Sequence, residues 1–461
     1  MRNPFTLPED ALFTNKKLFS MWLPVLIEQG MISIISMVDV SMSVYISETA
    51  VAGIALVSPL NALLKQILYA LAVGGSVVVS RSIGAQNKQE AGKSAKLLIY
   101  ILILTGILLN LLFWLGTNPL IAWMGGSVEP EVKRYATTFL QLSVCTLPFM
   151  SLYYAVTACY RAAGDTTRPM IASVSMTLLN LVIKYWFIYK LNLGVFGAGL
   201  SSLVAAAVIG IFVLIQLLRT PHLIIVEKFW RPEWNSRLAA SMLTIGIPNS
   251  IESGLFQFGL LLLQRLSAGF GTYALSADAI AKAITPLTHV FDTCAGLVLV
   301  TVVGQTMGAK RLDQTKLYLR HIMRLEYLIT VPINILVVVF SPQLVGLYHV
   351  SAETAEIATV ILRIYTGFSI LFHPTAFALP YAMRGAGDTK FTMAASITSM
   401  FSIRIACAYL FARTFQLGIY GVWLAMALEW VIKSAVFLLR QKSGKWLTAD
   451  KKTKKAEVSA T

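Results

Sequence analysis

Charged residues are scarce in this sequence. Asp, Glu, Lys and Arg make up 13% of the 461 residues, and only 22 of them are acidic. An ordinary soluble domain contains about 25% charged residues. Apolar residues instead make up 56% of the chain. This is too little charge to cover the surface of a soluble protein, and the composition predicts a membrane protein.

Cysteine is also rare, and the patterns expected of metal sites and nucleophiles are missing. The four cysteines fall inside apolar stretches, without disulfide or metal-ligand spacing. No loop carries a paired-histidine motif, an acidic metal-binding cluster or a nucleophile motif. The sequence therefore predicts no metal, no cofactor and no enzymatic activity. The cysteines are Cys145, Cys159, Cys294 and Cys407.

Long apolar stretches dominate what is present. Each is long enough to cross a hydrocarbon core of about 30 Å as a helix. The first carries two carboxylates and no small-residue cleavage site, which favours a spanning helix over a removable signal. We therefore expect an all-α membrane protein with twelve transmembrane helices. The stretches are 18–46, 53–80, 97–118, 136–160, 169–190, 193–218, 239–268, 277–303, 318–341, 355–382, 391–413 and 416–439.

Four pieces of the sequence recur downstream in the same order. Their offset is 223 or 224 residues throughout, which chance matches rarely produce. A duplicated membrane unit is typical of secondary transporters. The pieces are Pro24 with Glu28 (again as Pro248 with Glu252), Gly84-Ala85 (Gly308-Ala309), Arg161 to Thr166 (Arg384 to Thr389), and Gly194 with Gly197 (Gly418 with Gly421).

The duplication predicts two pseudo-symmetric lobes of six helices. An even number of helices per copy means that both copies enter the membrane from the same side, so the repeat is parallel. We expect a cytoplasmic N-terminus at 1–15, a first lobe at 16–219, a linker at 220–237, a second lobe at 238–440 and a basic tail at 441–461.

The basic residues indicate the orientation in the membrane. Most lie at the N-terminus, in the loops after the even-numbered stretches and in the tail; Lys133, Arg134, Lys190 and Arg413 lie in or beside the opposite loops. By the positive-inside rule both termini are cytoplasmic. The formal charge of +16 then reflects short cytoplasmic loops and a tail that attracts anionic headgroups. It does not indicate a nucleic-acid partner.

The repeated motifs resemble those of the multidrug and toxic compound extrusion (MATE) family. The resemblance covers residues 15–440 and includes the Arg-x-x-Gly-Asp-Thr segments. It implies a V-shaped pair of lobes around a central cavity, in a monomer of the plasma membrane. It also implies alternating access, with export of amphiphilic small molecules in exchange for protons or sodium ions. Distant relatives that flip lipid-linked sugars share the architecture.

Several repeated residues are interpreted as structural or gating elements. Gly164 allows a tight turn, and Asp165 or Thr166 can cap the following helix. Pro248 removes a helical hydrogen bond one turn before Glu252 and can open the backbone there. The candidates in this class are Pro24, Pro248, Gly164, Asp165, Gly387 and Asp388.

Ionisable residues inside the spans are candidates for ion coupling, because charge at that depth is costly. Glu28 and Asp39 are eleven residues apart, so they share one helix face about 16 Å apart. Asn180 and Lys184 share a face of the fifth span. The resemblance implies a second aspartate where Lys184 stands. An ammonium beside Asp39 would repel sodium and favour proton coupling, unless Lys184 extends to the outer interface.

The second lobe has its own candidates. Glu252 is the best placed, and Asp292 and Glu429 lie near the middle of their spans. The histidines His289 and His373 are interpreted as packing residues in preference to proton relays. The full set of coupling candidates is Asp39, Glu28, Asn180, Lys184, Glu252 and Asp292.

Basic residues deep in the spans leave the cargo open. Lys65, Arg363 and Arg404 lie about 12–20 Å inside their spans. They favour anionic cargo if they face the cavity, and otherwise form ion pairs with Asp278, Asp292, Glu326 and Glu429. The candidates for the substrate cavity are Lys65, Arg404, Glu429, His373 and Tyr153. An ion-coupled exporter of amphiphilic compounds is the first hypothesis, and a flippase or exporter of an anionic or lipid-linked substrate is the alternative.

Overall fold

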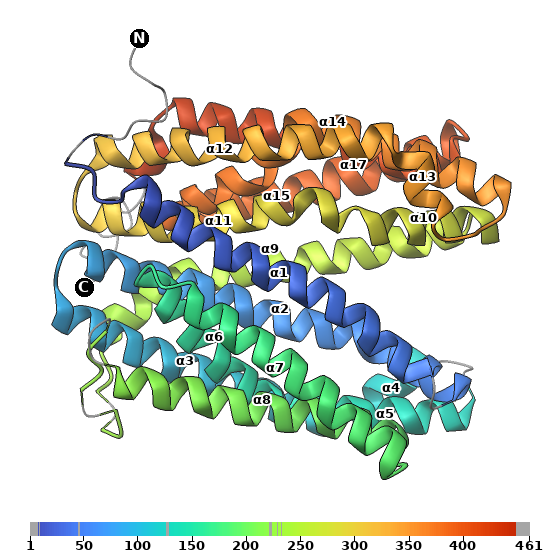
Figure 1. Ribbon diagram of the computed structural model, residues 1–461, viewed down its shortest axis with the longest axis horizontal. Coiled ribbons are helices and arrows are strands. Elements are labelled where there is room, and N and C mark those ends of the chain that lie inside the picture. The colour runs from blue at the N-terminus through green and yellow to red at the C-terminus, as the bar shows by residue number, and fades with distance from the viewer. Residues whose placement is uncertain are drawn as a thin grey trace. The chain divides into compact units, whose positions relative to one another are not determined.

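The computed structural model describes residues 8, 10–44, 47–125, 129–220, 224–227, 229–231 and 233–448, and over these ranges the chain is helical with no strand. Figure 1 shows the helices in chain order. Those of the first repeat are α1 (Asn15–Val44), α2 (Glu48–Gly84), α3 (Lys88–Leu115), α4 (Thr117–Gly125), α5 (Pro130–Cys145), α6 (Leu147–Ala162), α7 (Thr167–Tyr185), the π-helix η1 (Trp186–Lys190) and α8 (Gly194–Arg219).

The second repeat follows with α9 (Ser236–Ala268), α10 (Thr272–Ile284), α11 (Pro286–Gly308), α12 (Leu312–Val339), α13 (Ser341–Gly346), α14 (Ala352–Gly385), α15 (Thr389–Thr398), the π-helix η2 (Ser399–Ile405), α16 (Ala406–Tyr409), the π-helix η3 (Leu410–Thr414), α17 (Gly418–Lys442) and the 3₁₀-helix η4 (Lys445–Leu447).

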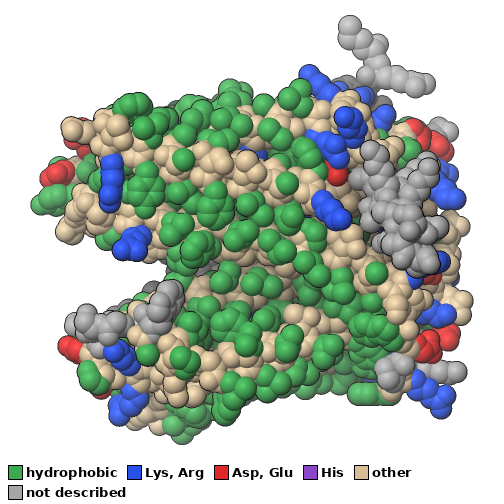
Figure 2. Space-filling view, turned by 180° about the vertical axis from the view of Figure 1, so that it is seen from behind, with side chains coloured by type: hydrophobic (Ala, Val, Ile, Leu, Met, Phe, Trp, Pro, Cys, Tyr) green, Lys and Arg blue, Asp and Glu red, His purple; other side chains and the backbone are tan. Residues whose placement is uncertain are grey.

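Ten helices in the described chain are long and apolar enough to cross a membrane. They match ten of the twelve predicted stretches. The other two stretches are α1 and α9, which have 30 and 33 residues but lie outside that group of ten. Apolar side chains cover the helices along their lengths, and Lys and Arg gather near the helix ends (Figure 2). On α3, for example, Leu104, Leu108 and Leu112 are each more than 60% exposed, as expected of a face that contacts lipid.

Local capping explains where α3 begins. The side chain of Asn87 accepts a hydrogen bond from the backbone N–H of Glu90 at 3.0 Å and donates to the Glu90 carboxylate at 2.9 Å. The first of these bonds satisfies one backbone donor that the first helical turn leaves free, and the second holds the two side chains together. The short loop after Gly84 therefore ends in a defined helix start.

The chain divides into two compact units that differ from the two predicted lobes. One unit is Leu23–Ser250, and the other combines Met1–Trp22 with Ile251–Thr461. The divisions fall inside α1 and α9, one residue before Pro24 and two residues after Pro248. The first turns of each repeat's first helix therefore group with the other repeat. The bounds predicted for the lobes and for the linker at 220–237 stay a prediction.

Packing within each unit explains this exchange. In the second unit Phe13, Leu18 and Met21 join the apolar core that contains Tyr318, and the Tyr318 hydroxyl accepts a hydrogen bond from the Phe13 backbone at 2.6 Å. In the first unit α9 approaches α2 closely, because a Cβ on Gly74 would lie 2.6 Å from the Cα of Gly246. The segments that precede the two prolines are thus held by apolar contacts with residues that are far away in the sequence.

The start of the basic tail packs into the second unit. Within residues 441–461, predicted as a basic cytoplasmic tail, Trp446 and Leu447 lie in the same core as Phe13, with Trp446 only 1% exposed. Burying an indole stabilises this segment by about 2–3 kcal/mol. Residues 449–461 of the predicted tail lie outside the described residues.

The fifth span differs between the repeats. In the first repeat α7 is uninterrupted until η1, whereas the second repeat has the π-helix η2 as well as η3. The offset between repeats is 223 residues at Arg384 and 224 at η3 and Gly418. The second repeat therefore has one residue more than the first between these points, and the additional π-helix η2 lies in this interval.

Candidate functional site

A buried carboxylate pairs with an arginine in the first repeat. One Nη2 of Arg161 on α6 lies 2.7 and 2.9 Å from the two oxygens of Glu28 on α1. Glu28 is 3% exposed and Arg161 is 8% exposed. Tyr153, a candidate for the substrate cavity, is buried beside this pair. Pro24 precedes Glu28 by one helical turn, so backbone freed by proline adjoins the ion pair.

The second repeat contains the matching pair. Nη2 of Arg384 on α14 lies 2.6 Å from Oε1 of Glu252 on α9, and Pro248 precedes Glu252 by one turn. Both arginines open an Arg-x-x-Gly-Asp-Thr segment. The sequence treated these segments as helix junctions and the two glutamates as ion-coupling stations. The structure joins each glutamate to the motif of its own repeat.

The rest of the motif has the same glycine conformation in both repeats but a different role for its aspartate. Gly164 and Gly387 both adopt positive φ, at 78° and 88°, which glycine tolerates best. Asp165 caps α7 by accepting hydrogen bonds from two backbone N–H groups and pairs locally with Arg168 at 3.0 Å. Thr166 makes no capping bond.

Asp388, the counterpart of Asp165, makes no capping bond to α15. It accepts two hydrogen bonds from Arg440 on α17, at 2.7 and 3.0 Å. The first repeat has Gln216 at the position that corresponds to Arg440. The same motif residue therefore starts a helix in one repeat and ties two helices together in the other.

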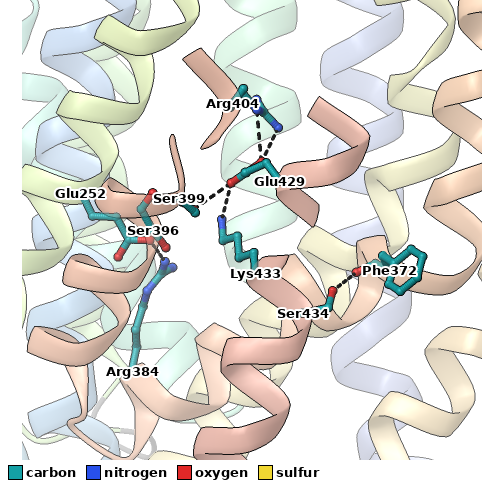
Figure 3. A network of polar contacts seen from close by, with 9 residues as sticks. All are labelled: Glu252, Phe372, Arg384, Ser396, Ser399, Arg404, Glu429, Lys433 and Ser434. Carbon is teal, nitrogen blue, oxygen red and sulfur yellow. Dashed lines mark hydrogen bonds and ion pairs between the residues drawn. The ribbon is translucent and has the colours of Figure 1, made fainter. Parts of the chain in front are cut away.

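A second ionic cluster is found beside the Glu252–Arg384 pair (Figure 3). Glu429 on α17 is fully buried, and its Oε2 accepts hydrogen bonds from Arg404 on η2 at 2.9 and 3.1 Å. Its Oε1 accepts a hydrogen bond from Ser399 at 3.0 Å. Residues five apart are neighbours in a π-helix, so η2 presents Ser399 and Arg404 to one carboxylate. Lys433 lies one turn along α17 from Glu429.

Asp292, His373 and Glu326 form a third buried group. Nδ1 of His373 on α14 lies 2.5 Å from Oδ2 of Asp292 on α11, and His289 stacks on His373 at 5.7 Å. Glu326 on α12 is 2% exposed, and neither of its oxygens has a hydrogen-bond donor among the described residues. It also lines a cavity of about 460 Å³ near the start of α1. His373 thus has a polar partner, whereas the described contact of His289 is a ring packing contact.

The first-repeat candidates on α7 lie close to the end of that helix. Lys184 is 4% exposed, so it does not extend to the surface of its unit, and it takes part in an interaction there. Asn180 is partly buried and accepts a hydrogen bond from Ser202 at 3.4 Å. Asp39 belongs to α1, but its side chain lies outside the described residues. The predicted meeting of Asp39 with Lys184 stays a prediction.

The deep basic residues are mostly engaged by polar partners. Besides the Arg404–Glu429 pair, Lys282 contacts Asp278 at 2.7 Å and Arg363 donates a hydrogen bond to Ser341 at 2.9 Å. Lys65 is partly buried and also has a partner. The interpretation of internal ion pairs is supported for Arg404 and Lys282, whereas the hydrogen-bond partner of Arg363 is a neutral hydroxyl group. Within the described ranges no group of three or more His, Cys, Asp or Glu side chains could hold a metal ion.

Sequence reasoning missed three of the charged residues in these groups. Arg161 and Arg384 were quoted for their motif but not as partners of the glutamates, although their recurrence at nearly the same offset as Glu28 and Glu252 was a usable signal. Lys433 was not considered. Its spacing of four residues from Glu429 puts both on one helix face, which could have identified it.

Comparison with known proteins shows which family this chain resembles. The MatE family model matches residues 24–186 and 248–410, so its two matches begin at the two repeated prolines. The chain is 24% identical over 442 residues to a probable multidrug resistance protein NorM of Thermotoga maritima, which covers 95% of this chain and 94% of the relative. It is 23% identical to the multidrug export protein MepA of Staphylococcus saprophyticus, over 87% of each chain.

Solved structures share the fold. A MATE protein in a bent conformation matches with a TM-score of 0.87 and 20% identity, over 95% of this chain and 96% of that one. A Pyrococcus furiosus transporter of the MOP superfamily, described as having a binding pocket of reverse polarity that suggests a different function, matches with a TM-score of 0.86 and 20% identity, over 94% and 96%. The two family matches cover most of the chain in duplicate, and this protein belongs to the MATE family of multidrug efflux transporters.

Proposed function

We propose that this protein exports amphiphilic small molecules by alternating access, driven by inward proton flow. It acts as a monomer in the plasma membrane with both termini cytoplasmic, and it needs no cofactor beyond the coupling ion. One observation carries the proposal. Each repeat places a proline and a buried carboxylate–arginine pair where its first helix leaves one compact unit.

The prolines support a conformational cycle. Pro24 and Pro248 each remove one backbone hydrogen bond from a long helix, and such positions bend at lower cost than a regular helix. They stand next to the boundaries between the units. Bending at these positions changes the helix direction while the core of each unit is kept.

The ionic contacts support a proton over a sodium ion. A hard cation needs several oxygen ligands, but Glu28, Glu252 and Glu429 already contact arginines at 2.6–2.9 Å. A proton needs only one acceptor. Asp292 and Glu326 supply two neighbouring buried carboxyl groups, of which Asp292 contacts His373, and each carboxyl group offers a single acceptor for a proton.

The test is transport in proteoliposomes with proton and sodium gradients imposed separately. We expect export of a cationic dye to follow the proton gradient and to be unaffected by sodium. Asp39→Asn and Glu252→Gln keep side-chain size but remove a titratable charge, so each should reduce uphill export strongly if it carries the ion. Export that follows sodium alone would refute proton coupling.

Orientation has its own test. Single cysteines in place of Lys442 and Lys190 should react with a membrane-impermeant thiol reagent from opposite sides of right-side-out vesicles. Lys442 ends α17 and Lys190 ends η1. Labelling of the Lys442 position from outside would reverse the proposed topology.

The alternative is export or flipping of an anionic or lipid-linked substrate. It is favoured by one observation, namely that the cluster of Glu252, Arg384, Arg404, Glu429 and Lys433 holds three cations and two carboxylates. An organic anion should therefore be compared with the cationic dye in the same vesicles. Preferential export of the anion would favour this alternative.

A further inference from the structure

The buried cluster in Figure 3 carries one more cation than it has carboxylates. Glu252 and Glu429 each contact one arginine, Arg384 and Arg404 respectively, at 2.6 and 2.9 Å. Lys433 is the third cation. The five side chains are between 0 and 13% exposed. A net charge of +1 away from water is unfavourable, so the cluster has a reason to lose one charge.

Lys433 is the least firmly bound of the three cations. Its Nζ lies 3.9 Å from Oε1 of Glu429, which is beyond hydrogen-bond distance. Its other contacts are with the aromatic rings of Phe377 and Phe256, at 4.5 and 5.8 Å from the ring centres. Aromatic faces next to a carboxylate are also the surroundings in which proteins bind organic cations.

Lys433 is also the group that can change its charge most readily. Arginine stays protonated in proteins, and an arginine held against a carboxylate keeps that carboxylate ionised. Lysine, by contrast, readily loses its proton when buried. Loss of that proton would leave the cluster with two cations and two carboxylates.

We propose that Lys433 carries a coupling proton and that a protonated Lys433 and an organic cation bound between Phe256, Phe377 and Glu429 exclude one another. The inference rests on the proposed function and deepens it. In one state the proton occupies Lys433. In the other, neutral Lys433 leaves the aromatic faces and Glu429 to the cation, and the cluster carries +1 in both. The exchange therefore conserves charge at this site.

The groups that face Lys433 come from four elements. Glu429 precedes it on α17, Arg404 approaches from η2, Glu252 from α9 and Arg384 from α14. His373 stacks on Phe377 at 4.2 Å and is bound to Asp292.

The first repeat lacks the elements of such a site. The residues that correspond to Glu429 and Lys433 are Ala205 and Ile209, and its buried Glu28–Arg161 pair is neutral as a whole. Among the described residues, the proposed exchange site therefore belongs to the second repeat.

The experiment measures binding of tetraphenylphosphonium, which has no proton of its own, to the purified full-length protein. The variants are Lys433→Met and Lys433→Arg, with Lys442→Met at the exposed end of α17 as control. We expect the wild type and the control to release a proton upon binding, and Kd to fall about tenfold for each unit by which the pH rises, as for competition with one proton.

Each variant at position 433 has a distinct expected result. Lys433→Met should bind the cation without proton release and with a pH-independent Kd. In proteoliposomes it should exchange labelled for unlabelled cation across the vesicle membrane, but it should not concentrate the cation against its gradient. Lys433→Arg, permanently charged, should bind at least tenfold more weakly than wild type at alkaline pH. Lys433→Gln serves if the methionine variant does not fold, as judged by gel filtration and melting temperature.

Two outcomes would overturn the inference. One is proton release or uphill export by Lys433→Met at the wild-type level. The other is that Lys433→Met no longer binds an organic anion such as benzoate while its cation binding is unchanged. This result would make Lys433 an anion-binding group. Failure of the proposed function is separate, because then the wild type itself would not export a cation in response to a proton gradient.

Discussion

Ala205 and Ile209 of the first repeat stand where the second repeat has Glu429 and Lys433. Both repeats share a buried glutamate–arginine pair after a proline. Only in the second repeat, within the described chain, does a further cluster of three charged residues adjoin that pair, with Arg404 supplied by a π-helix that α7 lacks. The glutamate–arginine pair is thus common to both repeats, and the further charged cluster belongs to the second.

The difference also extends to the helix junctions. Asp165 caps its own helix and pairs with Arg168 one turn on, whereas Asp388 is bound by Arg440 from another helix. A local contact can form in either repeat alone. A contact between helices depends on a residue elsewhere in the chain, and the first repeat has Gln216 in that place. Duplication preserved the motif while its partners diverged.

The largest expected effect comes from Glu429→Gln. It leaves Arg404 and Lys433 buried without their carboxylate, and breaking a buried ion pair in this way costs about 5 kcal/mol of unfolding free energy. The triple variant Glu429→Ala, Arg404→Leu, Lys433→Ile copies the apolar character of the first repeat and should recover most of the loss. Thermal melting in detergent measures both. Equal melting temperatures for Glu429→Gln and wild type would contradict the assigned contacts.

Arg161→Met should follow, with a loss of about 3–4 kcal/mol, because Glu28 is left buried and unpaired. Arg384→Met should cost about half as much, since Lys433 still faces Glu252. Glu28→Gln combined with Arg161→Met should be more stable than Arg161→Met alone. A larger loss for Arg384→Met than for Arg161→Met would break the comparison between the repeats.

Substitution of the motif aspartates should separate capping from tethering. Asp388→Asn weakens a charge-assisted contact with Arg440 at two positions and should cost about 1–3 kcal/mol. Asp165→Asn keeps a capping side chain and loses a partly exposed ion pair, so it should cost less than about 1 kcal/mol. Denaturation of the two variants in parallel provides the measurement. A larger loss for Asp165→Asn than for Asp388→Asn would contradict the assignment of the tethering role to Asp388.

A smaller effect than that of Asp388→Asn is expected from Ser399→Ala, which removes one hydrogen bond to a buried carboxylate that keeps two others. We expect a loss of about 1–2 kcal/mol. Thr177→Ala on α7 is the control, because its hydroxyl donates only to a backbone carbonyl of its own helix. Melting temperatures that drop equally for both would mean that η2 contributes nothing specific to Glu429.

Hydropathy and spacing were enough to predict much of this molecule. The apolar stretches became helices with small shifts at their ends, and the repeat offset anticipated the two family matches that begin at Pro24 and Pro248. Charge spacing on a single helix was also readable in principle, as with Glu429 and Lys433. The apolar pattern and the charge spacing are both local signals, because a helix brings together residues three or four positions apart.

The sequence by itself determined that this is a duplicated membrane transporter of the MATE family, because length, apolarity and repeated motifs are properties of the linear chain. Only the tertiary structure decided that α1 and α9 divide between the units at their prolines, and that Glu28 and Glu252 meet arginines 133 and 132 residues away. It alone assembled three cations around two carboxylates. Such contacts depend on which helices pack together, and no periodicity within one helix specifies that choice.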